Sequence, residues 1–373
     1  MSIYRFDEIA INSTAKKKPV EEDKYHYLGL EHLDKGEIFV HRYGSDVAPI
    51  GEKLIMHKGD VLFGKRRAYQ KKVAVAPFDG IFSAHGMVLR PNKKVVDPSF
   101  FPLFIASDYF LKKAIRLSVG SLSPTINWSD LRKAEFELPS IAKQKTLAKI
   151  LWSMVETQEA YKDLLQKTDE LVQSRFVEMF GDPLLNDKCW PVKKMADVAP
   201  SIPYDGDVDQ IDGKFWLLNL DMVESNTGRI IEKLYFTPDE MGQSISAFSS
   251  EYVLYSKLRP YLNKVVLPTE NGYATNELVA LLPDKKYLTR EYLAKMLMGK
   301  IFLGYIKNHV SGTKMPRVIM DDFWKFDMML PPIDMQKKFT AFAEQADRSK
   351  IALQQSLDAL NKTYKKIIAE NLG

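Results

Sequence analysis

The residues best suited to chemistry in this chain are basic, and they occur at two related places. The segment Lys65–Lys72 holds arginine, lysine, tyrosine and glutamine side chains. Arginine can pair with guanine or phosphate, glutamine with adenine, and lysine with phosphate. Residues 257–264 repeat the pattern, but Leu258 replaces Arg66 and Asn263 replaces Lys71. We interpret the retained positions as contacts to a nucleic-acid backbone and the altered ones as candidates for reading bases. The alternative is a buried strand and turn with Tyr69 in the core.

Two further sets of polar residues accompany these segments. Ser83–His85 correspond to Thr275–Glu277, and the loops at 119–124 and 311–316 are rich in glycine, serine and threonine. Short hydroxyl groups and free backbone N–H groups could hold phosphates there, although both loops could equally be ordinary turns. The candidate DNA-binding residues are Lys65, Arg66, Arg67, Tyr69, Gln70, Lys71, Lys72, Ser83, His85, Ser121 and Ser123 in the first half, and Lys257, Arg259, Tyr261, Asn263, Lys264, Thr275, Asn276, Thr313, Lys314 and Arg317 in the second.

Signatures of catalysis are absent from the sequence. It has no GxxxxGK, GxGxxG, HExxH or GxSxG motif. The six histidines show no metal-ligand spacing, and Glu277 replaces His85 in the second half. The tetrapeptide of amino-methyltransferases is missing, and Pro283-Asp284 lacks the Glu-x-Lys of a nuclease. We therefore predict no catalytic residue, no metal site and no cofactor.

The composition fits a globular protein of two or three domains. The chain has 373 residues, 45% of them hydrophobic, and a single cysteine, so neither a disulfide framework nor a CxxC site is expected. The first residues lack the apolar region of a signal peptide, and no apolar run reaches the roughly 18 residues of a membrane span. We expect a soluble, cytoplasmic protein. The net charge of +5 favours nucleic-acid binding only if basic groups gather on one face.

An internal repeat indicates which elements position these side chains. Residues 59–75 align with residues 251–267, so that residue 65 lies opposite residue 257 at an offset of 192. The same offset continues without a gap to Gln144 and Gln336. This period far exceeds the roughly 20–50 residues of a solenoid repeat, which indicates a duplicated domain.

Each copy alternates short apolar runs with turn residues, which predicts an α+β fold. The expected strands are residues 61–63, 72–76 and 86–89 in the first copy and 253–255, 265–267 and 278–282 in the second. A helical stretch follows at about 99–117 and 290–308. A last strand then ends at Leu138 and at Leu330.

A heptad pattern follows each last strand. No glycine or proline interrupts residues 142–180, about 39 residues or roughly 58 Å of helix. The predicted seam comprises Leu147, Leu151, Met154, Tyr161, Leu165 and Val172 in the first helix, and Phe339, Leu353, Leu357, Leu360 and Tyr364 in the second.

Two packing arrangements are open for these helices. Each could pack on its own globular domain, or the two could pair as an antiparallel coiled coil that holds the domains apart with pseudo-two-fold symmetry. We favour the second, because it covers both apolar seams. Gln158 and Lys350 occupy one equivalent polar seam position and are candidates to fix the register. The predicted domains are 1–140 and 182–332, with spacer helices at 141–181 and 333–373.

At this point the sequence resembles a known family along its whole length. The helix end LVQSRFVEMFGDP (171–183), the GDVL strand (59–62) and the run that ends at Leu138-Pro139 are similar to those of the specificity subunit of type I restriction–modification systems (HsdS). That family usually has Glu-Gln where each long helix begins. Here Gln144 and Gln336 are preceded by lysine and methionine, which we expect to alter local capping rather than function.

The resemblance implies a DNA specificity subunit with two target-recognition domains. Each domain would read one half of a bipartite, asymmetric target in double-stranded DNA, while the helices set the spacer and dock two methyltransferase subunits. Restriction subunits, which are ATP-dependent translocases and nucleases, would complete the complex. S-adenosylmethionine and ATP would bind to those partners. Two other hypotheses remain open: a self-contained DNA modification or restriction enzyme, and a coiled-coil scaffold with no role on DNA.

Overall fold

The computed structural model describes residues 1–242 and 244–372. The chain divides into two compact units. Unit 1 comprises Met1–Lys162 and Gln354–Gly373, and unit 2 comprises Asp163–Leu353. Each long helix therefore contributes one segment to each unit. None of the helices in the described part of the chain combines the length and apolar character that crossing a lipid bilayer requires.

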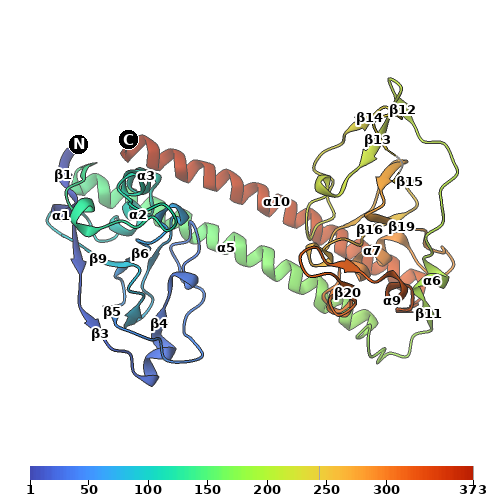
Figure 1. Ribbon diagram of the computed structural model, residues 1–373, viewed down its shortest axis with the longest axis horizontal. Helices are drawn as coiled ribbons and strands as arrows, with labels where there is room; N and C mark the ends of the chain where they lie inside the picture. Colours follow the sequence, from blue (N-terminus) through green and yellow to red (C-terminus); the bar gives the residue numbers. More distant parts are fainter. Residues whose placement is uncertain (243, 373) are drawn as a thin grey trace. The chain divides into compact units, whose positions relative to one another are not determined.

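Unit 1 contains two four-stranded sheets and a short two-stranded one. Figure 1 labels β1, β3, β4, β5, β6 and β9 of these sheets. The strand orders are β2-β9-β6-β7 and β3-β5-β8-β4, and β1 pairs with β10. The strands are β1 (Ser2–Arg5), β2 (Ala10–Ser13), β3 (Lys16–Lys17), β4 (Tyr27–Leu28), β5 (Lys53–Met56), β6 (Val61–Phe63), β7 (Val73–Val75), β8 (Gly80–Phe82), β9 (Met87–Pro91) and β10 (Glu135–Leu138). The helices are α1 (Phe6–Ile9), α2 (Phe101–Ala106), α3 (Asp108–Arg116), α4 (Trp128–Leu131) and the start of α5 (Ile141–Phe180), with short 3-10 helices η1 (Glu21–His26), η2 (Leu30–His32) and η3 (Ala68–Gln70).

Unit 2 repeats most of this order. Its larger sheet runs β12-β13-β18-β15 with β14 added to β13, and the others are β17-β16-β19, β11-β22 and β20-β21. The strands are β11 (Val192–Lys194), β12 (Gln210–Ile211), β13 (Lys214–Leu218), β14 (Tyr235–Phe236), β15 (Ile245–Phe248), β16 (Val253–Ser256), β17 (Val265–Val266), β18 (Gly272–Thr275), β19 (Leu278–Leu281), β20 (Val310–Ser311), β21 (Arg317–Val318) and β22 (Asp327–Met329). The helices are α6 (Met195–Val198), α7 (Arg290–Met298), α8 (Lys300–Lys307), α9 (Met320–Trp324) and the start of α10 (Ile333–Leu372), with 3-10 helices η4 (Leu220–Met222) and η5 (Pro260–Leu262).

The mixed α/β content predicted from the sequence is confirmed, with one difference in each copy. The stretches predicted as one helix, at 99–117 and 290–308, are each two helices. The helical conformation is interrupted at Ser107 and at Gly299, which have extended ψ angles of 147° and 145°. Ser107 caps the second helix by accepting a hydrogen bond from the N–H of Phe110 at 3.2 Å, so the break also satisfies a helix end.

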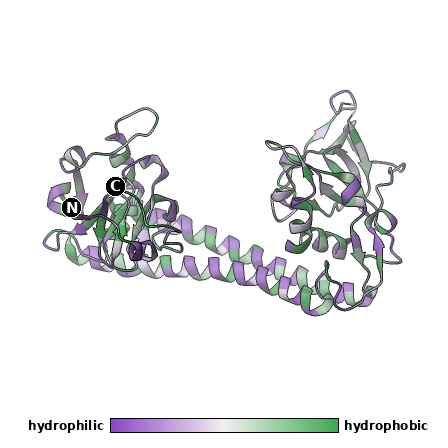
Figure 2. Ribbon diagram, turned by 60° about the horizontal axis from the view of Figure 1, so that its bottom comes forward, coloured by the Kyte–Doolittle hydropathy of each residue, from purple (hydrophilic) through white to green (hydrophobic). Residues whose placement is uncertain are grey.

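Both long helices contribute to the cores of both units. In unit 1, Leu147, Leu151 and Val155 of α5 share a core with Ile368 and Leu372 of α10. In unit 2, Phe176 and Phe180 of α5 lie against Phe339 of α10, with ring centroids 5.3 and 5.4 Å apart. All of the predicted seam residues are buried or half-buried. Figure 2 shows hydrophobic residues on the central strands of each unit and mixed character along the two long helices.

A buried glutamine joins the start of each long helix to its globular part in the same way. Gln144 accepts from the N–H of Asp97 at 2.8 Å and donates to the carbonyls of Val95 and Pro139. Gln336 forms the equivalent bonds with Thr289, Tyr287 and Pro331, each partner 192 positions further along the chain. Three hydrogen bonds on a buried amide fix the direction in which each helix leaves its domain.

Candidate nucleic-acid interface

The segments predicted to bind nucleic acid form two turns with the same backbone conformation. In unit 1, Arg67 and Lys71 flank η3 with φ angles of 53° and 52°. In unit 2, Arg259 and Asn263 flank η5 with φ angles of 50° and 49°. The left-handed region costs a residue with a side chain about 1–2 kcal/mol, so this conformation needs support from its surroundings. Strain that is kept in both copies is a feature of functional sites.

Backbone hydrogen bonds to the glycine-containing loops support the two turns. The N–H of Arg67 donates to the carbonyl of Pro124 at 2.7 Å, and the N–H of Arg259 donates to Pro316 at 2.7 Å. In unit 1 the Nε of Arg67 also lies 3.5 Å from the Oγ of Ser123. The loops of the polar candidates and the basic turns are therefore brought together within each unit.

A tyrosine occupies the middle position of each 3-10 turn, and its side chain is exposed to solvent. Tyr69 is 50% exposed and Tyr261 is 48% exposed. The alternative interpretation that Tyr69 is a core residue is wrong, because Ala68 takes the buried position of the turn. An exposed aromatic ring beside an arginine is suited to apolar and stacking contacts with a nucleic acid.

Several candidate side chains have partners inside their own unit. Lys72 donates to the carbonyl of Leu30 at 2.5 Å, and its counterpart Lys264 donates to Leu220 at 2.7 Å. Lys71 pairs with Asp108 at 2.6 Å. Its counterpart Asn263 donates to the carbonyl of Met298 at 2.9 Å.

Ser83 was predicted to contact DNA, but its side chain is buried, with only 7% of the residue exposed. Its Oγ accepts from the N–H of His85 at 3.3 Å. The four side chains Lys71, Lys72, Asn263 and Lys264 tie each turn to its own unit. The structure therefore gives them a positioning role, which the sequence pattern did not distinguish from contact with DNA.

The exposed part of the unit 1 turn is a basic cluster. Arg66 and His85 are both exposed, and the Nη1 of Arg66 lies 3.4 Å from the Nε2 of His85. Partial burial, followed by the positive charges of Arg66, Lys65 and Lys53, lowers the pKa of His85. Burial and the charge of Lys16 lower the pKa of Lys65.

The electrostatic effects of Lys16 and Lys53 identify two basic residues outside the predicted DNA-binding set. Lys16 is on the edge strand β3 and Lys53 on the neighbouring strand β5, where Lys16 lies opposite Leu54. Adding them extends the positive surface beside the unit 1 turn. Such a concentration of positive charge favours a phosphate backbone.

The equivalent place in unit 2 has an ion pair. Arg317 donates to both carboxylate oxygens of Glu277, at 2.6 Å from Nη2 and 3.4 Å from Nε. The hydrogen bonds that Arg317 donates to Glu277, and the negative charge of that carboxylate, raise the pKa of Arg317. Among the other candidates of unit 2, Lys257 and Thr275 are half-buried and Asn276 is exposed. Thr313 and Lys314 are exposed on the loop that precedes Arg317.

The remaining candidates of unit 1 lie on its surface. Ser121 is exposed, whereas Ser123 and Gln70 are half-buried. Together with the turn, these residues present hydroxyl and amide groups beside guanidinium groups. The arrangement has the side-chain types that contact DNA phosphates and base edges.

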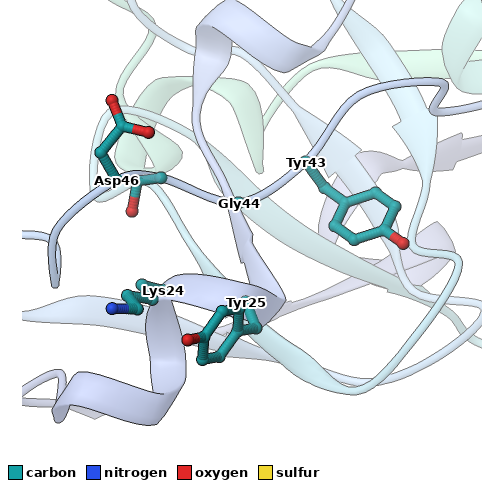
Figure 3. A pocket seen from close by; sticks show the side chains of 6 residues that line it. Lys24, Tyr25, Tyr43, Gly44 and Asp46 are labelled. Carbon is teal, nitrogen blue, oxygen red and sulfur yellow. The ribbon is translucent and has the colours of Figure 1, made fainter.

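Two cavities lie in unit 1. One, of about 330 Å³, is lined by Lys24, Tyr25, Tyr43, Gly44, Ser45 and Asp46 (Figure 3). A second, of about 370 Å³, lies beside α5 at Trp152.

One group of side chains in the described part of the chain could hold a cation. It consists of Glu37, His41 and Glu159 in unit 1. Lys162 already donates to the carboxylates of both glutamates, and His41 lies 3.1 Å from Glu159. The lysine thus supplies the positive charge, and the group anchors the loop of residues 33–52 to α5.

Comparison with known proteins gives a family for the first part of the chain. Residues 8–168 match the family described as type I restriction modification DNA specificity domain. The specificity subunit of the type I restriction enzyme EcoDI from Escherichia coli is 24% identical over 168 residues, which are 44% of this chain and 36% of that protein. The chain therefore matches just over a third of that relative's length.

Two solved structures share the fold over nearly the whole chain. The S subunit of a type I restriction–modification system from M. genitalium superposes with a TM-score of 0.60 and 12% identity, covering 100% of this chain and 96% of that one. A chain from a study of the assembly and conformational transition of the type I R-M system gives a TM-score of 0.55 and 17% identity, covering 99% and 97%. At these identities the likeness concerns the fold.

Proposed function

We propose that this chain, whose residues 8–168 belong to the type I restriction modification DNA specificity domain family, is the DNA specificity subunit of a type I restriction–modification complex. It selects the DNA sequence and carries out no catalysis itself. Methylation belongs to two methyltransferase subunits and cleavage to restriction subunits. S-adenosylmethionine and ATP would bind to those partners.

The observation that carries this proposal is the strained turn that occurs twice. Arg67 and Arg259 hold the same left-handed conformation at the same place in two units, each beside an exposed tyrosine. We propose that each unit reads one half of a bipartite target through its turn. Since Arg66 and His85 correspond to Leu258 and Glu277, the two half-sites differ and the target is asymmetric.

We further propose that the long helices form an antiparallel coiled coil between the target-recognition domains at 1–140 and 182–332. Support comes from the contacts of Phe176 and Phe180 with Phe339, and from the ion pair of Lys350 with Asp169. Such a pair of helices sets the length of DNA between the half-sites. Its outer surface would dock the methyltransferase subunits.

The proposal is tested by expressing the chain with its methyltransferase subunits and sequencing the methylated DNA. A split, asymmetric motif is expected. Replacing residues 59–139 by those of a relative should change only one half of that motif. A motif that changes in both halves would contradict modular reading, and a single continuous motif would contradict a bipartite target.

Two controls separate this function from the alternatives. The purified chain alone, incubated with S-adenosylmethionine, magnesium and DNA, should neither methylate nor cleave, whereas activity would show a self-contained enzyme. Insertion of one heptad after Gln158 and another after Lys350 should lengthen the unread spacer and leave both half-sites intact. An unchanged spacer would show that the helices do not set its length.

A further inference from the structure

The two units share one backbone frame beside their turns. In unit 1 the residues Arg66 and Thr125 form an antiparallel bridge, and the N–H of Ile126 donates to Lys65 at 3.0 Å. In unit 2 the residues Leu258 and Arg317 form the equivalent bridge, and the N–H of Val318 donates to Lys257 at 2.8 Å. All of these positions correspond at the offset of 192.

The side chains on this frame differ in a coordinated way. The arginine lies on one side of the bridge in unit 1, at Arg66, and on the other side in unit 2, at Arg317. Its partner changes with it: Arg66 lies beside the imidazole of His85, whereas Arg317 is bound by the carboxylate of Glu277. His85 and Glu277 occupy equivalent positions. Their carbonyls accept from the N–H groups of Arg66 and Lys257, which differ by one position in the alignment of the two copies.

These two sets offer different hydrogen-bonding groups to a base edge. Arg66 has only donors, and the imidazole of His85 offers one donor when it is neutral. Guanine presents two acceptors, N7 and O6, in the major groove, so the unit 1 set is complementary to guanine. Glu277 has only acceptors, and Arg317 already holds its carboxylate in place. A fixed carboxylate is complementary to an exocyclic amino group, that of cytosine or adenine.

From this difference we infer that the bridge positions determine which class of base each half-site contains. The Arg66–His85 set selects a base with acceptors, and the Glu277–Arg317 set selects a base with an amino donor. This inference rests on the proposed function and specifies it further. The backbone frame stays constant because it is held by main-chain bonds, so the side chains of residues 66, 85 and 125 can change without moving it.

The test uses the complete complex with its methyltransferase subunits and reads the methylated motif by sequencing. Glu277→Ala should relax one position of one half-site, with discrimination at that position falling roughly 10- to 100-fold. Glu277→Gln keeps the size and the arginine contact but adds donors, so it should accept a base without an amino group at the same position. The matched control is Glu270→Ala, which removes a carboxylate from another ion pair of unit 2, that with Lys233, and should leave the motif unchanged.

A transfer between the units provides a gain-of-function test. The triple variant Arg66→Leu, His85→Glu and Thr125→Arg builds the unit 2 set on the unit 1 frame. It should introduce a requirement for an amino-bearing base into the other half-site and leave the half-site of unit 2 as it was.

The possible results separate the inference from the proposed function. If the wild-type chain directs a split motif and Glu277→Ala and Glu277→Gln leave every position unchanged, the inference is overturned while the proposed function stands. If the wild-type complex methylates no defined motif, the proposed function fails and the inference with it. Relaxation confined to one position of one half-site supports both.

Discussion

Arg67 and Arg259 lie 192 positions apart in the sequence and adopt nearly the same left-handed conformation, with φ angles of 53° and 50°. Neither is glycine, the residue that tolerates this region without steric cost. The chain thus keeps a guanidinium group in both turns where a glycine would fit the backbone better. The backbone conformation favours glycine at both positions, whereas the proposed DNA contact requires arginine.

Arg67→Gly should therefore uncouple stability from DNA binding. Relief of about 1–2 kcal/mol of left-handed strain offsets about 0.5–1 kcal/mol of added unfolded-state entropy, so the free energy of unfolding should change by less than about 1 kcal/mol. The affinity for a target duplex should fall roughly 10-fold or more, since an arginine contact is lost. Thermal denaturation and fluorescence anisotropy measure the two effects. Asp212→Gly, at a left-handed residue outside the turns, is the control and should leave affinity unchanged.

The buried glutamines should be essential to stability. Gln144→Ala leaves the N–H of Asp97 and two carbonyls without their partner, which should lower the free energy of unfolding by about 2–3 kcal/mol. Gln336→Ala should cost a similar amount, because its bonds are equivalent. Urea denaturation measures both, with the exposed helix residue Gln355 replaced by alanine as the control. Equal stability of Gln144→Ala and Gln355→Ala would exclude this role.

DNA binding should strengthen as the pH falls, through His85. Burial and the nearby cations Arg66, Lys65 and Lys53 lower the pKa of His85 below 6.5, so the ring is neutral at pH 7 in the free protein. An acceptor atom of the bound DNA beside the ring favours the protonated form, and binding then takes up a proton. Affinity should rise from pH 7 towards pH 5.5 in the wild type. The rise should be smaller in His85→Gln, and an identical pH profile would remove His85 from the interface.

The same shift has the opposite effect on folding. A histidine whose pKa is lowered in the folded state stabilises that state above its unfolded pKa of about 6.5. This contribution is lost as the pH falls through the folded pKa. In the absence of DNA, unit 1 should therefore become slightly less stable over the pH range in which its affinity for DNA increases. Thermal denaturation of the wild type and of His85→Gln at several pH values would show the difference.

The aromatic cluster where the two long helices meet in unit 2 should be important for that unit. Phe339→Ala removes a ring that contacts Phe176 and Phe180 and is 1% exposed, which should cost about 3–5 kcal/mol. Phe339→Leu should cost less, because it leaves a smaller cavity. Hydrogen exchange should show the loss of protection in residues 163–353, while the core of residues 1–162 keeps its own.

Much of the fold could be predicted from the sequence because it is encoded in local patterns. The heptad spacing predicted a helix at 142–180, and α5 spans Ile141–Phe180. The offset of 192 also holds in the structure, where α10 begins at Ile333 and both helices have 40 residues. The resemblance to type I specificity subunits is confirmed for residues 8–168, which match the type I restriction modification DNA specificity domain family.

What could not be predicted depends on partners that are distant in sequence. The pairing of Ser2 with Leu138 joins β1 to β10, and nothing in either segment identifies the other. The ammonium group of Lys72 is bound by Leu30, 42 positions away, so a basic pair alone does not show which lysine faces solvent. The ion pair of Arg317 with Glu277 similarly joins a loop to the end of a strand.

The division of the long helices between the units also affects the order in which the protein can fold during its synthesis. Ile368 and Leu372 complete the core of unit 1, but a ribosome adds them after all of residues 163–353. Unit 2 has its whole sequence available earlier and can close first. The domain that is translated first is therefore completed after unit 2, and its apolar surface on α5 stays uncovered until Ile368 and Leu372 have been added.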